Sequence, residues 1–158
     1  MSQLQFTRRQ YEIPFNTDDV IKAGSFESIV DFEIDRVFPM VYFNNINPTT
    51  ERIRAIIYSD STYGTAIYQS NWYTFADLTS IGPYGRWYIP IAFNNWNIKK
   101  GIQYFISFEI GNYTRSLSSY IAIESDVIDA IHDNDLSDSN IVTNSPYRYL
   151  VRGNAKPI

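Results

Sequence analysis

The sequence predicts an all-β fold, an antiparallel β-sandwich built as a single domain. Aromatic residues make up 16% of the chain, with 13 tyrosines and 10 phenylalanines, and such side chains pack well on a pleated surface. Apolar and polar residues alternate along several short segments, most clearly at 30–35, 86–93 and 103–110. Turn signals such as Gly82-Pro83-Tyr84-Gly85 separate these segments. A length of 158 residues suits one domain.

The elements follow from the pattern in chain order. Alternation predicts an N-terminal strand or arm over 3–15 and a half-buried strand over 25–36, where apolar residues alternate with acidic ones. Further short strands are expected at 38–43, 51–58, 65–69, 72–75, 86–93, 103–110 and 120–123, with 94–97 and 99–101 as the connection between the two clearest ones. The only helix candidate is 126–132. Eight or nine short strands with frequent turns are typical of a sandwich.

The two ends of the chain differ from its middle. We expect an arm at 1–15, the sandwich at 16–125 and a polar C-terminal extension at 126–158. Residues 124–138 carry six acids and no Lys or Arg, whereas 147–158 carry three basic residues and no acid. Exposed apolar side chains are costly, so the C-terminal segment is expected to make assembly contacts; the residues assigned to this interface are Tyr147, Arg148, Tyr149, Leu150 and Arg152. Packing of both ends on their own domain as edge strands is the alternative.

Composition excludes several classes of function. The net charge of -4 argues against a nucleic-acid partner, which needs clustered Lys and Arg. No apolar run reaches the roughly 18 residues that span a bilayer, and no secretory signal follows the N-terminal arginines, so no membrane insertion is expected. The chain has no cysteine, which excludes disulfides, thiolate metal sites and cysteine nucleophiles.

The residues that carry catalysis in enzymes are sparse. His132 is the only histidine, and no Gly-x-Ser-x-Gly motif accompanies it. Glu109 and Glu124 are candidates for the paired carboxylates of a glycosidase, although solvated strand ends are the simpler interpretation. We therefore expect no enzymatic activity and no required cofactor. Calcium is the one metal considered: Asp133, Asp135 and Asp138 space oxygen ligands suitably, but the Gly and terminal Glu of an EF-hand loop are missing.

Aromatic residues are the candidates for sugar binding, because sugar rings stack on flat aromatic faces. Trp96 stands between asparagines in an expected loop, so the predicted glycan site consists of Trp96, Asn94, Asn95 and Tyr84. A protein interface is the other use of such a residue. Trp72 and Trp87 are expected in the core.

Four motifs in the middle of the chain resemble a known module. They are Tyr58-Ser59-Asp60, Ser70-Asn71-Trp72, Gly85-Arg86-Trp87-Tyr88 and Lys100-Gly101-Ile102-Gln103-Tyr104. Together they are similar to the jelly-roll modules of tailed-phage virion proteins and of bacterial surface or secreted proteins, although Arg86 interrupts the Gly-Trp step. The resemblance implies a jelly-roll-like antiparallel sandwich with extended terminal arms.

The resemblance also implies two functions. The first is a non-enzymatic structural virion protein, a capsid-decorating, head-fibre or tail-associated subunit assembled in the host cytoplasm. Its partners would be other virion proteins or copies of itself. The second is a carbohydrate-binding module that mediates cell-surface adhesion through glycans. The motif residues are mostly structural, so they speak for fold more than for function.

Overall fold

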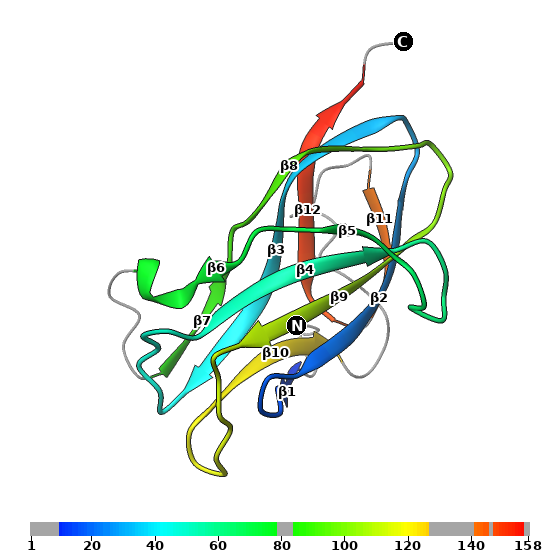
Figure 1. Ribbon diagram of the computed structural model, residues 1–158. Coiled ribbons are helices and arrows are strands. Elements are labelled where there is room, and N and C mark those ends of the chain that lie inside the picture. The colour runs from blue at the N-terminus through cyan, green and yellow to red at the C-terminus, as the bar shows by residue number, and fades with distance from the viewer. Residues whose placement is uncertain (1–9, 79–83, 127–140, 146, 157–158) are drawn as a thin grey trace, which may run out of the picture.

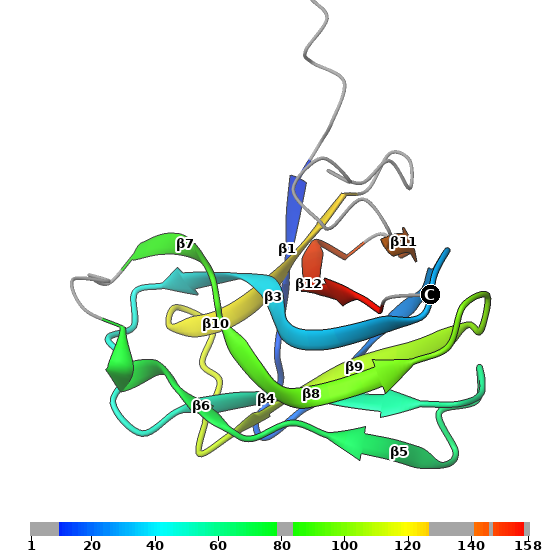
Figure 2. The same ribbon diagram turned by 90° about the horizontal axis from the view of Figure 1, so that it is seen from above.

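The computed structural model describes residues 10–78, 84–126, 141–145 and 147–156. These residues form two antiparallel sheets packed face to face (Figure 1), which Figure 2 shows as two layers. The all-β sandwich predicted from the sequence is confirmed. Within the described residues the one helical element is a single 3-10 turn, η2, at Phe75–Asp77.

In the part of the chain that the structure describes, twelve strands make up the two sheets. They are β1 (Gln10–Pro14), β2 (Val20–Ser28), β3 (Phe32–Asn44), β4 (Arg52–Tyr58), β5 (Ala66–Gln69), β6 (Tyr73–Thr74), β7 (Tyr84–Tyr88), β8 (Ile91–Ile98), β9 (Tyr104–Gly111), β10 (Tyr120–Asp126), β11 (Ile141–Asn144) and β12 (Tyr149–Ala155). The first sheet contains β1, β10, β3 and β12, with β7 and β8 also on β3. The second sheet has the order β11-β2-β9-β4-β5, with β6 also on β4.

The strand pairs are nested. β1 pairs with β10, β2 with β9, β3 with β7 and β8, and β4 with β5 and β6. The chain therefore forms one antiparallel ribbon that turns back on itself between β4 and β5. Because β10 also pairs with β3, and β9 with β4, this ribbon is rolled into two facing sheets. Such winding is that of a jelly roll.

The C-terminal part of the chain belongs to the sandwich, which corrects the boundary expected at residue 125. β11 extends the second sheet by pairing with β2, and β12 extends the first sheet by pairing with β3. Tyr149, Leu150 and Val151 are buried there, because the apolar face that would be costly in an arm is covered by the domain itself. Packing on the same domain, the alternative stated above, is what the structure has for residues 141–156.

The N-terminal segment is partly integrated as well. β1 is hydrogen-bonded to β10 along its length, with Ile13 opposite Ile123. Phe15, the next residue in the chain, is fully buried, and its N–H donates to the carbonyl of Ile121 at 2.9 Å. Residues 10–15 are thus a strand of the sandwich, and residues 1–9 lie outside the described part.

Pro39 divides the longest strand, β3, into two halves. On one side of β3, residues 40–44 pair with β7 and residues 32–37 pair with β8. On the other side, residues 41–44 pair with β10 and the first half of the strand pairs with β12. Pro39 has no N–H to donate, and a central strand normally excludes it for that reason. Here it stands where the partner strands change, and its carbonyl still accepts the N–H of Ile89 at 3.0 Å.

Two predicted segments have different boundaries in the structure. The segment 25–36 is broken after Ser28, since the chain crosses there from the second sheet to the first. The segment 94–97, expected as a connection, is part of β8, because Trp96 and Ile98 turn inward and continue the buried side of the strand. The helix candidate at 126–132 lies outside the described residues except for Asp126, the last residue of β10.

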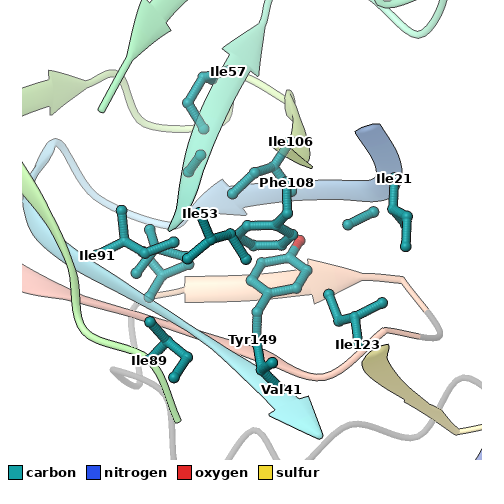
Figure 3. Packing of buried hydrophobic residues seen from close by; sticks show 14 of the residues in the cluster. Ile21, Val41, Ile53, Ile57, Ile89, Ile91, Ile106, Phe108, Ile123 and Tyr149 are labelled. Atoms are coloured by element: carbon teal, nitrogen blue, oxygen red, sulfur yellow. The ribbon is translucent and has the colours of Figure 1, made fainter. Parts of the chain in front are cut away.

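The core lies between the sheets and is built from isoleucine and aromatic side chains (Figure 3). Phe108 of β9 meets Tyr149 of β12 edge to face, with ring centroids 5.8 Å apart, so the C-terminal strand contributes directly to this core. Trp87 packs against the core as expected. Trp72 is outside the core cluster, a correction that locates the candidate site.

Candidate functional site

The predicted glycan site around Trp96 has a different geometry from the one expected. A bulge in β8, with Asn95 at a φ of 47°, leaves Asn94 and Asn95 exposed while Trp96 points toward the rim of the core. The Trp96 ring stacks on Tyr68, with centroids 5.0 Å apart. The hydroxyl of Tyr68 accepts the N–H of Asn94 at 2.8 Å. Much of the ring is therefore occupied by the chain itself. Tyr84 begins β7, and its side chain lies outside the described part.

Trp72 lies instead on the outer face of the second sheet. Arg52 and Arg54 alternate along β4 with Ile53 and Ala55, which are fully buried, so both arginines point away from the core. Their guanidinium carbons are 4.2 and 4.4 Å from the centroid of the Trp72 ring. At such distances a cation is attracted to the ring and its planar group is held in place.

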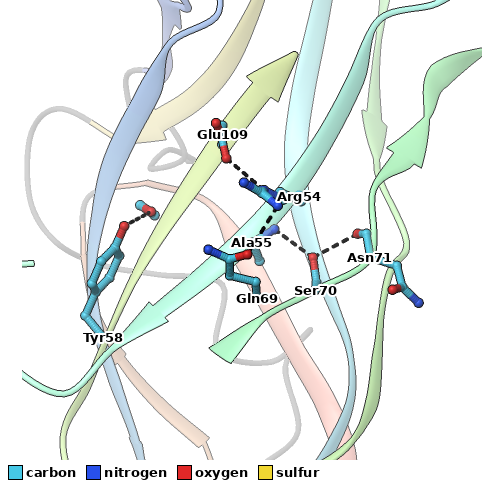
Figure 4. Close-up of polar contacts among 8 residues, drawn as sticks. Arg54, Ala55, Tyr58, Gln69, Ser70, Asn71 and Glu109 are labelled. Atoms are coloured by element: carbon cyan, nitrogen blue, oxygen red, sulfur yellow. Dashed lines mark hydrogen bonds and ion pairs between the residues drawn. The ribbon is translucent and has the colours of Figure 1, made fainter. Parts of the chain in front are cut away.

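The surface around this indole is defined here as the Arg–Trp face and consists of Arg52, Arg54, Gln69, Trp72 and Glu109. Arg54 is its best-fixed member (Figure 4): its Nε donates to Glu109 Oε1 at 2.7 Å and its terminal nitrogen to Gln69 Oε1 at 3.3 Å. Glu109 lies directly opposite Arg54 on the neighbouring strand β9. The ion pair is partly exposed, so its contribution is to orientation more than to stability.

Ser70 explains why the indole reaches this face. Its N–H donates to the carbonyl of Ala55, and its hydroxyl oxygen accepts the N–H of Ala55, both at 2.9 Å. The hydroxyl in turn donates to the carbonyl of Asn71 (Figure 4). The buried serine of the Ser-Asn-Trp motif thus fixes the backbone beside β4, and Trp72 follows two residues later.

Arg52 differs from Arg54 in its partners. Its Nε is buried and has no hydrogen-bond acceptor among the described residues. A Cβ on Gly111, opposite Arg52 on β9, would lie 3.2 Å from both this nitrogen and the Trp72 ring, so the glycine leaves room for both side chains. The arginine is held by the indole and faces outward with unused donors.

The same face continues into an aromatic cluster of Tyr58, Tyr63 and Phe105. Tyr63 meets Tyr58 and Phe105 edge to face, with centroids 5.1 and 5.9 Å apart. Its hydroxyl accepts the N–H of Gly24 at 3.0 Å and donates to the carbonyl of Gly24 at 3.2 Å, and burial raises its pKa. The loop between β4 and β5 is therefore fastened across the sheet. Lys22 Nζ lies 5.2 Å from the Tyr63 centroid.

The charge of this surface has the opposite sign to the net charge of the whole chain. Lys22, Arg52 and Arg54 provide positive charge and Glu109 the negative charge, whereas the protein as a whole has a net charge of -4. The three cations and one carboxylate give this part of the sheet a positive charge, which attracts an anion. The alternation of Arg52 and Arg54 is visible in the sequence, and it is the signal that could have indicated the site.

The two carboxylates considered for catalysis do not share a cleft. Glu109 points outward from the second sheet, and Glu124 lies on β10 of the first sheet, with the core between them. Each has its own arginine: Arg54 for Glu109 and Arg86 for Glu124. The structure therefore does not bring them together as a glycosidase pair, and the solvated position expected for Glu124 is wrong, because its side chain is fully buried. His132 lies outside the described residues.

A separate apolar surface surrounds Ser28 at one end of the sandwich and is defined here as the apolar end. It consists of Ile29, Ile102 and Val142, which are 57%, 49% and 47% exposed. Ile29 follows Ser28 in the chain, and on β11 the buried Ile141 is opposite Ser28 while Val142, the next residue, is opposite Glu27. The carbonyl of Ser28 accepts the N–H of Gly101, the residue before Ile102. Three aliphatic side chains thus remain in water around one buried residue.

The expected interface and metal residues have mixed outcomes. Tyr149 and Leu150 are buried within their own domain, so they do not form an exposed contact surface; the hydroxyl of Tyr149 donates to the carbonyl of Ser25 at 3.1 Å. Tyr147 and Arg148 are half-buried and Arg152 is exposed; their role stays a prediction. Asp133, Asp135 and Asp138 lie outside the described residues, and the described part contains no cluster of three metal-ligating side chains.

Comparisons of this chain with protein-family models, with curated proteins and with solved structures find no match. Within the described part, no helix has the length and apolar character needed to cross a bilayer.

Proposed function

We propose that this protein is a non-enzymatic structural subunit of a tailed-phage virion, a capsid-decorating, head-fibre or tail-associated protein that acts through protein–protein interfaces. The observation that carries the proposal is the apolar end. Ile29, Ile102 and Val142 come from three different segments, so their common exposure is a property of the fold and not of one loop. Exposed apolar patches on otherwise well-packed domains mark interaction sites.

The partner proposed for the apolar end is a second copy of this chain or another virion protein. Three branched aliphatic side chains give a small hydrophobic centre of the kind that anchors an interface. The resemblance of four motifs to the jelly-roll modules of virion proteins is consistent with this assignment. Localisation of this protein in the virion is part of the same proposal.

Light scattering coupled to size exclusion tests the interface. Ile29→Ser, Ile102→Ser and Val142→Ser are combined in one variant. The matched control is Leu117→Ser, because Leu117 is 94% exposed in the loop after β9. Ile102 is in the loop before β9, and these two loops lie at opposite ends of that strand (Figure 1). We expect the wild type and the control to self-associate, or to bind purified particles, and the triple variant to do neither. Equal behaviour of all three proteins would contradict the proposed interface.

A second candidate function is carbohydrate binding in cell-surface adhesion, and the Arg–Trp face is the observation that favours it. Indole, guanidinium, amide and carboxylate groups converge there on a rigid sheet, which is the mixture that sugar recognition uses. Preformed sites with a few fixed polar groups on rigid elements are typical of ligand recognition. Both functions coexist in a receptor-binding virion subunit, since the apolar end and the Arg–Trp face lie on different parts of the domain.

A further inference from the structure

We propose that the Arg–Trp face binds an acidic saccharide and that Arg52 receives the sugar's carboxylate. This inference rests on the second proposed function, sugar binding, and names the class of sugar. The inference rests on two neighbouring arginines. The Arg52 guanidinium has unused donors and packs against the Trp72 indole. Beside it, the Arg54 guanidinium already binds the Glu109 carboxylate.

The first step is the state of Arg52. A guanidinium stays charged at every physiological pH and carries five N–H donors. Its Nε is buried without an acceptor, and none of its donors has a partner among the described residues. A ligand does not reach the buried Nε, but the terminal nitrogens of Arg52 carry further N–H donors from which a bound anion can accept hydrogen bonds. Arg52 is therefore the member of the face whose bonding is completed by a ligand.

The second step is pre-organisation. The guanidinium carbon of Arg52 is 4.2 Å from the Trp72 ring centroid, and the absence of a Cβ on Gly111 lets both side chains pack closely over β9. Stacking orients the planar fork and reduces the entropy lost when an anion binds. The Ser70 hydrogen bonds to Ala55 fix the segment that carries the indole, so the binding geometry exists before the ligand arrives.

The third step is the choice of a carboxylate. Arg54, two residues from Arg52 on the same strand, already binds the carboxylate of Glu109 at 2.7 Å. Planar carboxylates fit the guanidinium fork in the same way. Glu109 also repels a doubly charged anion such as phosphate more strongly than a singly charged one. The face thus favours a single negative charge.

The fourth step separates a saccharide from an acidic peptide. Gln69 uses its Oε1 for Arg54, which leaves its amide N–H groups for hydroxyl oxygens. Glu109 bonds Arg54 through Oε1, which leaves Oε2 to accept from a hydroxyl. Donors and acceptors side by side suit the several hydroxyls of a sugar ring. A peptide carboxylate would use Arg52 alone.

The test is calorimetric titration of the full chain with matched probe pairs. One pair is oligogalacturonate and its fully methyl-esterified form, in which each carboxylate is replaced by a neutral ester; the second is sialyllactose and lactose, which lacks the acidic sugar. A poly-glutamate peptide represents the peptide alternative. The variants are Arg52→Gln and, as a matched control, Arg36→Gln, because Arg36 is exposed on β3 of the other sheet. Thermal melting verifies that both variants are folded.

We expect at least one acidic saccharide to bind, its neutral counterpart to bind roughly tenfold more weakly or not at all, and Arg52→Gln to cause a loss of similar size. Arg36→Gln should leave binding unchanged. Binding of neither acidic saccharide overturns the inference, as does equal binding of acidic and neutral forms. Poly-glutamate that binds as tightly, with the same dependence on Arg52, overturns the choice of a saccharide. If the neutral forms bind equally well, the proposal of sugar binding holds and only the preference for an acidic sugar is wrong. If no saccharide binds, both proposals are wrong.

Discussion

Arg86 and Glu124 form an ion pair on the outer side of the first sheet, and the two partners differ in burial. The Glu124 carboxylate is fully buried, whereas the Arg86 side chain is 45% exposed. Arg86 Nε donates to both carboxylate oxygens, at 2.7 and 3.0 Å. The same guanidinium also pairs with Glu12 of β1 and lies 4.9 Å from the Tyr42 ring, so one exposed arginine connects strands β1, β10, β3 and β7.

Replacing this arginine should destabilise the fold. Arg86→Leu leaves a buried carboxylate without its cation, and we expect the free energy of unfolding to fall by about 2 kcal/mol. Breaking a fully buried pair costs about 3–5 kcal/mol, and the exposure of Arg86 reduces the effect. Urea denaturation measures the change. Arg36→Leu is the control, with an expected change within about 0.5 kcal/mol. Adding Glu124→Gln to Arg86→Leu should restore part of the loss, and a further loss would contradict this account.

Gly153 should tolerate no side chain. It lies where the register of β12 on β3 shifts, and a Cβ there would lie 1.9 Å from the carbonyl oxygen of Glu33. Gly153→Ala therefore has to separate the two strands, which typically costs about 1–3 kcal/mol. Gly64→Ala is the control, because its Cβ would meet only side-chain atoms, the Thr62 hydroxyl at 3.2 Å and the Asp60 carboxylate oxygens at 3.9 Å. Thermal unfolding compares the two variants, and equal midpoints would mean that β12 is not packed as described.

Tyr149 should make stability decrease in alkali. Burial raises its pKa far above the ordinary value of 10.0, so the phenol is neutral in the folded protein and ionises near pH 10 in the unfolded chain. Its contribution to stability is full below pH 10 and is lost as the pH rises further, by up to about 1.4 kcal/mol per pH unit.

Tyr149→Phe tests this pH dependence. It should lower the free energy of unfolding at pH 7 by about 1 kcal/mol, since the hydrogen bond to Ser25 is lost, and it should make the decline between pH 9.5 and 11 shallower. Urea denaturation at several pH values measures both effects. Tyr120→Phe, which removes a hydroxyl with no partner among the described residues, should leave the slope unchanged. The same slope in Tyr149→Phe as in wild type would refute the assignment.

The strand pattern could be predicted from the sequence because alternation reports which side of a strand is buried. It could not locate the crossing after Ser28, since the apolar residues on both sides of the break keep the same spacing while the chain changes sheets. Nor could it show that β12 pairs with β3, because pairing between distant segments leaves no local periodicity. The polar C-terminal composition favoured an extension, and burial of Leu150 and Val151 outweighed it.

The candidate site was predicted only in part. An aromatic residue among polar neighbours indicated Trp96, but the bulge at Asn95 turns that ring toward the core. Trp72 was expected in the core, like Trp87. Its outward position depends on two tertiary contacts, the docking of Ser70 on β4 and the guanidinium groups of Arg52 and Arg54. Neither contact is local in sequence.

The most direct test of the proposed function uses particles from the source that encodes this chain. Particles purified on a density gradient are analysed by quantitative mass spectrometry, with the chain supplied as wild type, as the triple serine variant of Ile29, Ile102 and Val142, or as the Leu117→Ser control. We predict wild type and control at stoichiometric copy number in the particle fraction and the triple variant at least tenfold depleted, although still folded by circular dichroism. Absence of the wild-type chain from the particles, or undiminished incorporation of the triple variant, would contradict the account.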